Sequence, residues 1–390
     1  MIAKHQRDEL EFIQASQRLR LWAVTWNHGG ALLHKRDLSA FWPSVPTGSS
    51  HVIVIASQEC GEISGSAVNA DKSEWEQYLR GELESKQYVL LSARGLGATH
   101  CAVFVHQHIL PICGSVHSSV VACGIGNTLG NKGGVGIGLR LGHTSLLLVA
   151  CHLASGQGKV KERNLDVKAI DGRLQLVGPT QSSTAHSSRA TLRFDRVLWC
   201  GDMNYRLQAT RAEAESWLSC NEHATCVAAD QLTRERAGGD LLPGLSEGPL
   251  NFPPTYKLDL GAAAGRDGTR PPTATSGPFY DTGPKQRVPS WTDRVMFRPH
   301  DSRMALLQYD ALMQVAESDH RPVVAQFSMK LKTHHKDVEL MPSEQEWPHP
   351  QHMDEHMSPV SARGGPIASS PVSPLFVPVG HTQSQSCCLQ

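Results

Sequence analysis

The sequence predicts one large layered α/β domain, followed by a tail of different composition. Apolar, β-branched runs alternate with glycine-rich turns and a few helical segments over about 310 residues, and no Pro/Ser-rich break divides them. Hydrophobic residues make up 40% of the 390-residue chain and charged residues 19%, which suffices for a large core and excludes wholesale disorder. We therefore expect a folded domain over residues 18–330 and a disordered Pro/His/Ser-rich tail over residues 331–390.

Nine segments are expected to be strands, because each is an apolar run of strand length. In chain order they are Leu21–Thr25, His51–Ala56, Tyr88–Ser92, Ala102–Val105, Val135–Leu141, Leu146–Ala150, Val197–Cys200, Val295–Phe297 and Val323–Phe327. Two segments have helical spacing, Ser73–Glu84 and Ala209–Ser219. Ser182–Ser188 and Gly261–Gly277 are rich in small and turn-forming residues, so we expect both to be surface insertions.

The balance of charge and the cysteine spacing exclude several classes of protein. Lys+Arg and Asp+Glu both number 37, so the formal net charge is zero, which argues against a dedicated nucleic-acid binder. The ten cysteines are irregularly spaced and form no Cys-x-x-Cys pair, so neither a disulfide framework nor a structural zinc site is expected. No secretory segment or membrane-spanning run is recognisable. These features predict a cytoplasmic protein with reduced thiols.

Polar side chains follow or precede the expected strands at five places, where an α/β sheet would present a site. Each of them alone has a structural explanation as a cap, a turn or a surface group. The five are Trp26-Asn27, Gln58-Glu59, His152, Gly201-Asp202-Met203-Asn204 and Ser318-Asp319-His320. Together they indicate a functional site.

The chemistry of these side chains points to metal-assisted hydrolysis. Carboxylate and carboxamide oxygens without thiolates are hard ligands that suit Mg²⁺. Two histidines and a further carboxylate can orient water and donate hydrogen bonds to a phosphate. No Gly-x-Ser-x-Gly elbow is present, so we expect the nucleophile to be water.

Longer blocks of the sequence resemble the inositol polyphosphate 5-phosphatases of the endonuclease/exonuclease/phosphatase superfamily. The resemblance covers roughly residues 20–330, and its blocks occur in family order. They are Trp26-Asn27, Gln58-Glu59, Gly126–Val135, His152–Ala154, Gly201–Arg206, Phe252–Lys257, Pro289–Arg294 and Ser318–Val323. The Asn-Lys-Gly-Gly-Val, Pro-Thr-Tyr-Lys and Pro-Ser-Trp-x-Asp-Arg blocks distinguish this family from the nucleases of the superfamily.

The resemblance implies an α/β fold of the DNase I-like type, a four-layer sandwich of two packed mixed β-sheets flanked by helices. It also implies a Mg²⁺ ion held by Glu59 and Asn27, with Asp319 close to the metal.

The same resemblance assigns catalytic roles. Asp202 would orient or deprotonate the attacking water beside Asn204. His320 would donate a hydrogen bond to the scissile phosphate while Asp293 fixes its tautomer, and His152 would also contact that phosphate. Thr292 stands where the family usually has Cys, and since that position is thought to pack, we expect little effect.

Substrate choice is expected to depend on cations. The positions that match the family's contacts to the neighbouring 4-phosphate are Tyr256, Lys257, Lys285 and Arg287. Arg binds phosphate as a bidentate fork and Lys as a point charge. Asn131 and Lys132 add a further phosphate contact in one interpretation, and in the other their turn is simply packed by Gly133 and Gly134.

The last four residues, Cys387-Cys388-Leu389-Gln390, fit a Cys-a-a-X prenylation motif with Gln at X. This predicts farnesylation of Cys387, with geranylgeranylation of both cysteines as the alternative. One lipid chain binds a membrane only weakly and reversibly. We therefore expect a cytoplasmic protein associated peripherally with the cytosolic face of a membrane.

The function expected from these features is Mg²⁺-dependent removal of the 5-phosphate from phosphoinositides such as phosphatidylinositol 4,5-bisphosphate and 3,4,5-trisphosphate, or from soluble inositol polyphosphates. Two alternatives remain open. One is another phosphodiesterase of the superfamily, a nuclease or sphingomyelinase, and the other is an inactive membrane-tethered phosphoinositide-binding module. The expected partners are the inositide and a membrane surface reached through the prenyl anchor. No nucleic-acid partner is expected, and the chain is expected to be a monomer.

Overall fold

The computed structural model describes residues 16–30, 37–61, 71–124, 131–176, 187–260, 280–299 and 303–332. The chain divides into two units, Met1–His335 and Lys336–Gln390, and the second lies outside the described residues. Cys387, the segment Gly261–Gly277 and most of Ser182–Ser188 also lie outside them.

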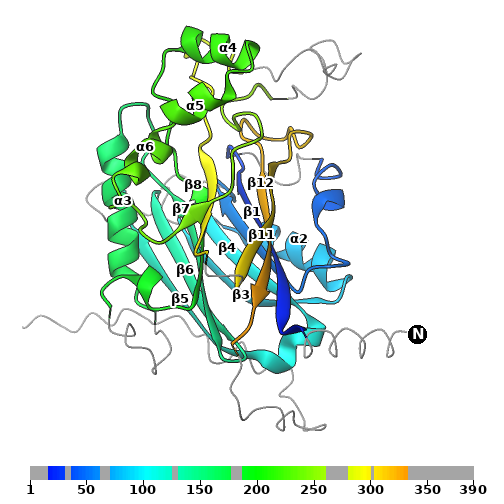
Figure 1. Cartoon of the computed structure of the whole chain (residues 1–390). Coiled ribbons are helices and arrows are strands. Elements are labelled where there is room, and N and C mark those ends of the chain that lie inside the picture. Colours follow the sequence, from blue (N-terminus) through cyan, green and yellow to red (C-terminus); the bar gives the residue numbers. More distant parts are fainter. Residues whose placement is uncertain are drawn as a thin grey trace, which may run out of the picture. The chain divides into compact units, whose positions relative to one another are not determined.

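Two six-stranded sheets form the centre of the first unit (Figure 1). In spatial order the first sheet contains β11 (Met304–Ala311), β12 (Val323–Lys330), β1 (Arg18–Asn27), β2 (Val52–Gln58), β4 (Thr99–His106) and β3 (Tyr88–Leu96). The second contains β5 (Cys113–Ala122), β6 (Gly133–Leu141), β7 (Thr144–His152), β8 (Arg196–Asp202), β10 (Asp293–Phe297) and β9 (Ser246–Glu247). Both sheets are mixed, since β1–β2 and β7–β8 are parallel and the other pairs antiparallel.

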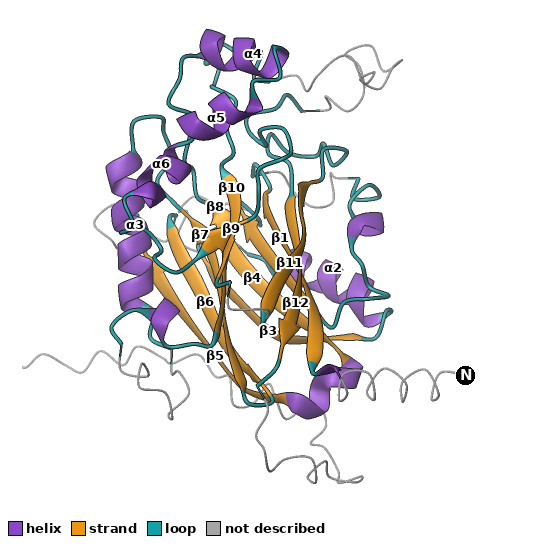
Figure 2. Ribbon diagram, in the orientation of Figure 1, coloured by secondary structure: helices purple, strands orange, loops and turns teal. Residues whose placement is uncertain are grey.

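Helices cover the outer faces of the two sheets, and two of them, α4 and α5, lie beyond one end of the sheets (Figure 2). The α-helices are α2 (Ser73–Glu84), α3 (Val160–Arg173), α4 (Arg211–Ser219), α5 (His223–Ala229) and α6 (Gln231–Ala237). Short 3₁₀ helices are η2 (Trp42–Ser44), η3 (Gln107–Ile112) and η5 (Ala190–Leu192). Helix, sheet, sheet and helix make four layers, so the predicted four-layer sandwich is confirmed. None of the helices in the described part of the chain is long and apolar enough to cross a lipid bilayer.

The middle segments of the central strands are mostly apolar because they are buried on both faces. In β1, Leu21 and Ala23 point into the core between the two sheets, whereas Trp22 and Val24 pack with Trp75 of α2 on the outer side. This alternation has the period of two residues that a strand imposes.

The nine predicted strands and the two predicted helices are present, and several elements were not predicted. Strands β5 and β11 lie at sheet edges, where alternate residues face solvent and the sequence is correspondingly polar. Helix α3 was missed because its inner face buries Arg163, Asp166 and Asp171 beside Val167 and Ile170, which weakens the apolar periodicity.

The register of β8 against β7 depends on a glycine. At Gly201 the backbone has φ 151°, and a Cβ there would lie 2.0 Å from the carbonyl oxygen of Cys151. We predict that Gly201→Ala lowers the free energy of unfolding by about 3 kcal/mol, because the strands must separate to admit the methyl group.

Urea unfolding followed by circular dichroism checks this value. Gly172→Ala in α3 is the matched control, because no heavy atom lies within 4 Å of its added Cβ, and we expect it to raise stability by about 0.5–1 kcal/mol. An unchanged unfolding midpoint in Gly201→Ala would contradict the proposed close approach.

Candidate active site

The sheet topology gathers the predicted site residues at one end of the sandwich. β1 and β2 are parallel and end at Asn27 and Gln58, and β7 and β8 are parallel and end at His152 and Asp202. β10 is antiparallel to β8 and begins at Asp293, which is the register partner of Asp202. β12 is antiparallel to β1, so residues 318–320, just before its start, reach the same end.

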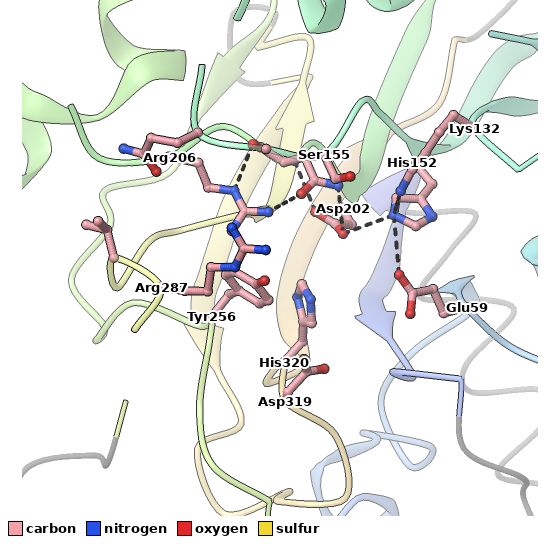
Figure 3. A pocket seen from close by; sticks show the side chains of 14 residues that line it. Glu59, Lys132, His152, Ser155, Asp202, Arg206, Tyr256, Arg287, Asp319 and His320 are labelled. Atoms are coloured by element: carbon pink, nitrogen blue, oxygen red, sulfur yellow. Dashed lines mark hydrogen bonds and ion pairs between the residues drawn. The ribbon is translucent and has the colours of Figure 1, made fainter. Parts of the chain in front are cut away.

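A cavity of about 250 Å³ opens at this end of the sandwich, and His152, Asp202, Asp319 and His320 line it (Figure 3). Asn27 and Asp293 are outside the lining and hydrogen-bond to Asp202 and His320. Glu59, His152 and Lys132 lie on one side of it, and Arg206, Tyr256 and Arg287 on the other, with Asp202 and His320 between them. The wall therefore combines carboxylates with imidazole, ammonium and guanidinium groups, which suits an anionic ligand that is bound together with a cation.

Asp202 is only 1% exposed, and its carboxylate oxygens are surrounded by hydrogen-bond donors. Its Oδ2 accepts hydrogen bonds from the amides of Asn27 (2.9 Å) and Asn204 (3.1 Å) and lies 3.2 Å from His152 Nε2. Its Oδ1 accepts the backbone N–H of Asn204 at 3.0 Å. Burial alone would raise the pKa of Asp202, but the hydrogen bond with His152 and the nearby positive charges lower it, so the carboxylate is ionised.

His320 and Asp293 form a buried dyad. His320 Nδ1 lies 2.9 Å from Asp293 Oδ2, which also accepts the hydroxyl hydrogens of Thr292 (2.8 Å) and Thr255 (2.9 Å). Burial opposes protonation of His320, but the charge of Asp293 outweighs it and raises the pKa of His320 to about 9. The imidazolium thus keeps Nδ1 on Asp293 and can donate Nε2–H to an anion in the cavity.

Thr292 has more than the packing role expected for it, because its hydroxyl helps to hold the Asp293 carboxylate. Thr255 was not singled out as a site residue, although it lies inside a quoted sequence block. Only the fold could show that these two side chains share one carboxylate oxygen.

Two of the three predicted metal-binding residues are in direct contact, and the third lines the same cavity as one of them. Asn27 donates to Glu59 Oε1 at 3.3 Å, and the Glu59 side chain remains 40% exposed toward the cavity. Asp319 also lines the cavity, where its Oδ2 lies 3.6 Å from Lys257 Nζ. Asp202, Asp293 and His320 form a second possible cation-binding group, with ligand atoms within 4.8 Å of one another. The direct His320–Asp293 hydrogen bond already occupies one ligand atom of each partner, which favours the Glu59 side for a cation.

The residues predicted to bind phosphate are only partly in the cavity wall. Lys132, Tyr256 and Arg287 line it, whereas Lys257, Lys285 and Asn131 are outside the lining. Lys285 and Asn131 are exposed, and Lys257 is half-buried. Lys132 is largely buried against the His152 ring, and burial lowers its pKa. The interpretation in which Lys132 only belongs to a packed turn therefore does not account for its position.

Arg206 lines the cavity although it was not predicted as a site residue. Its guanidinium contacts the side-chain oxygen of Asn204, donates to the Asn204 carbonyl at 3.1 Å, and lies 4.2 Å from the centre of the Tyr256 ring. Tyr256 in turn packs on His320, with ring centroids 4.4 Å apart. Arg206 thus connects the Asp202–Asn204 pair with the Tyr256–His320 pair.

One alternative nucleophile is present in the sequence. Cys200 and Arg206 have the Cys-x₅-Arg spacing that cysteine-dependent phosphatases use. Cys200 is 1% exposed, packs in the core between the sheets, and burial raises its thiol pKa well above the usual value. The burial and the raised pKa of Cys200 argue against its use as a nucleophile.

Comparison with known proteins identifies the family of the chain. Residues 24–326 match the model of Endonuclease/Exonuclease/phosphatase family 2. Phosphatidylinositol polyphosphate 5-phosphatase type IV of Rattus norvegicus is 31% identical over 342 residues, which cover 85% of this chain and 49% of that protein. Synaptojanin-2 of Homo sapiens is 30% identical and is covered to 22%. The chain spans about half the length of the first of these relatives.

Among solved structures, the inositol polyphosphate 5-phosphatase domain of SPsynaptojanin, in complex with inositol (1,4)-bisphosphate and calcium ion, superposes with a TM-score of 0.65 and 28% identity. The match covers 84% of this chain and 90% of that domain. Cimex nitrophorin superposes with a TM-score of 0.60 at 20% identity and shares the fold. As the sequence blocks predicted, the chain belongs to Endonuclease/Exonuclease/phosphatase family 2, and its curated relatives are inositol polyphosphate 5-phosphatases.

Proposed function

We propose that this protein is a Mg²⁺-dependent phosphatase that removes the 5-phosphate of phosphoinositides, including the 4,5-bisphosphate and the 3,4,5-trisphosphate, and of soluble inositol polyphosphates. The observation that carries the proposal is the joint placement of an ionised Asp202 and a protonated His320 on one cavity with a basic wall. The names of the matched relatives support the same reaction and substrate class.

The donor set fits a hard divalent cation. Glu59 and Asp319 offer carboxylate oxygens, and no thiolate lies among the three residues. Asn27 would offer its amide oxygen, which here accepts the backbone N–H of Gly29 at 2.9 Å. Mg²⁺ prefers such oxygens and needs only one or two carboxylates, because it keeps several waters. When bound, the ion supplies positive charge that neutralises the phosphate oxygens.

The protein's own side chains orient the reactants. Asp202 is held by Asn27, Asn204 and His152, so its ionised carboxylate can accept a hydrogen bond from a water in the cavity and then its proton. As the water oxygen bonds to phosphorus, the bond from phosphorus to the inositol oxygen breaks, and that oxygen takes a proton from solvent to become the inositol hydroxyl. His320 donates Nε2–H to a phosphate oxygen, and Lys132 adds positive charge from the wall that also carries Glu59 and His152.

A substrate panel tests this function. We predict that wild-type protein releases phosphate from inositides that carry a 5-phosphate, that EDTA abolishes the release and that Mg²⁺ restores it. Asp202→Asn should lower kcat by at least about 100-fold, because a carboxamide cannot take the proton of the water. Asp240→Asn, at an exposed aspartate, is the matched control and should leave kcat unchanged.

Two results would contradict the proposal. Release that is insensitive to EDTA would exclude the metal, and turnover of DNA or sphingomyelin in place of inositides would favour the phosphodiesterase alternative. Absence of turnover with any inositide, together with measurable binding, would favour the inactive binding module.

The dyad gives a second prediction. Asp293→Asn should lower kcat by about 10–100-fold with little change in KM, because the loss of the carboxylate charge removes the group that keeps His320 protonated and oriented. Steady-state kinetics on the soluble head group measure both constants. An unchanged kcat would show that His320 acts without Asp293.

We further infer that Cys387 carries a prenyl group that places the enzyme on the cytosolic face of a membrane. The support is the terminal Cys-Cys-Leu-Gln sequence, which lies outside the described residues. We predict a farnesylated C-terminus by mass spectrometry of protein purified from cells, and a shift of Cys387→Ser to the soluble fraction. An unmodified Cys387 in the native protein would refute the anchor.

A further inference from the structure

Helix α4 begins with an arginine that binds the backbone of the segment carrying Lys285 and Arg287. Arg211 Nη2 donates to the carbonyl of Tyr280 at 2.8 Å, and its Nη1 donates to the carbonyl of Arg287 at 2.6 Å. A longer contact of 3.5 Å joins Nη1 to the carbonyl of Asp281. One guanidinium therefore holds both ends of residues 280–287.

The same segment is tied to the strand-like stretch that contains Lys257. The Asp281 carboxylate accepts the N–H of Arg287 at 2.7 Å, and the Asp281 N–H donates to the carbonyl of Lys257 at 2.9 Å. Leu258 pairs with Tyr280 in a β-bridge. As a result, the three cations predicted to face a 4-phosphate belong to one connected piece of backbone, and Arg287 is the one of them that lines the cavity.

The start of helix α4, which carries Arg211, is stabilised by capping and packing contacts. Thr210 and Glu213 form a reciprocal capping box at the start of the helix, and Ala214 is fully buried beneath it. The Arg211 side chain is 18% exposed, and Glu215, one turn further on, pairs with it at 2.7 Å. Because the Glu215 side chain is 54% exposed, this ion pair contributes little to the free energy of folding. Its main effect is to hold the Arg211 guanidinium in the orientation that reaches the two carbonyls.

We propose that Arg211 is a positioning residue for substrate specificity: it fixes the backbone from which Lys257, Lys285 and Arg287 reach the phosphate next to the scissile one. Arg211 is not in the cavity lining, so it acts through the segment and not on the substrate. This role rests on the proposed function.

The physical basis is preorganisation. A planar guanidinium can bond two separated carbonyl oxygens at once in a fixed geometry, which a lysine ammonium on a flexible stem does not reproduce. Without the Arg211 guanidinium, residues 280–287 gain conformational freedom. Substrate binding must then order this segment, and the lost entropy weakens binding of the 4-phosphate. The reacting groups Asp202 and His320 are held by other contacts and should be unaffected.

Kinetics on two matched lipids test the proposal. The first is a short-chain inositol lipid with 4- and 5-phosphates, and the second carries the 5-phosphate alone. We predict that Arg211→Ala raises KM for the bisphosphate about tenfold, leaves kcat nearly unchanged, and leaves both constants for the monophosphate within about twofold. Arg211→Lys should retain part of the discrimination, and Glu215→Gln, which keeps the fork, should behave as wild type.

The Arg287→Ala variant and hydrogen-exchange measurements complement the kinetics. Arg287→Ala removes a cavity-lining cation and should show the same selective loss as Arg211→Ala. Hydrogen exchange should be faster at the Arg287 amide in Arg211→Ala and unchanged in Glu215→Gln, because only the first variant loses the carbonyl contacts.

The outcomes separate the two levels of inference. An equal loss on both lipids, or unchanged kinetics with both, would overturn the positioning role while leaving the phosphatase function intact. A wild-type enzyme that does not prefer the bisphosphate would overturn the 4-phosphate assignment and the role of Arg211 together. Thermal unfolding of each variant identifies a general loss of stability, and Arg211→Lys then decides the question in a folded protein.

Discussion

The buried negative charge of Asp202 is the constraint on which the site depends. A carboxylate removed from water needs hydrogen-bond donors and nearby positive charge, and here the donors come from different strands. Asn27 belongs to the first sheet and His152 to the second, so satisfying one charge fixes how the two sheets meet at this end. The cavity and the His320–Asp293 dyad lie at this junction, where the ends of the two sheets meet around Asp202.

Much of the fold could be read from the sequence because the central strands are buried on both faces. Runs such as Val52–Ala56 and Leu146–Ala150 are apolar throughout, and the polar residues that follow them mark the strand ends. Helix α3 could not be read in this way, because Arg163 and Asp166 take core positions that apolar residues usually occupy. Their burial is compensated by contacts with distant residues such as Gln231, which no local pattern reveals.

The site was predicted at the level of residue types and less well at the level of contacts. Asp202, His152 and His320 lie together as expected, whereas Lys285 is outside the cavity lining. Arg206 and Thr292 were not expected to serve the site, since their partners are known only once the chain is folded. Cimex nitrophorin superposes on this chain, so the side chains at the strand ends, more than the layers, distinguish function within this architecture.

The pairing of β8 with its two neighbours also limits how this protein can change. His152 and Asp293 both face Asp202 as register partners across the ladder, and side chains on a strand alternate between faces. Inserting one residue within β8 would therefore turn Asp202 away from both partners at once, whatever residue was added. Insertions and deletions should accumulate in the connections between strands, such as the one from His152 to Arg196. The number of residues in each strand should stay constant.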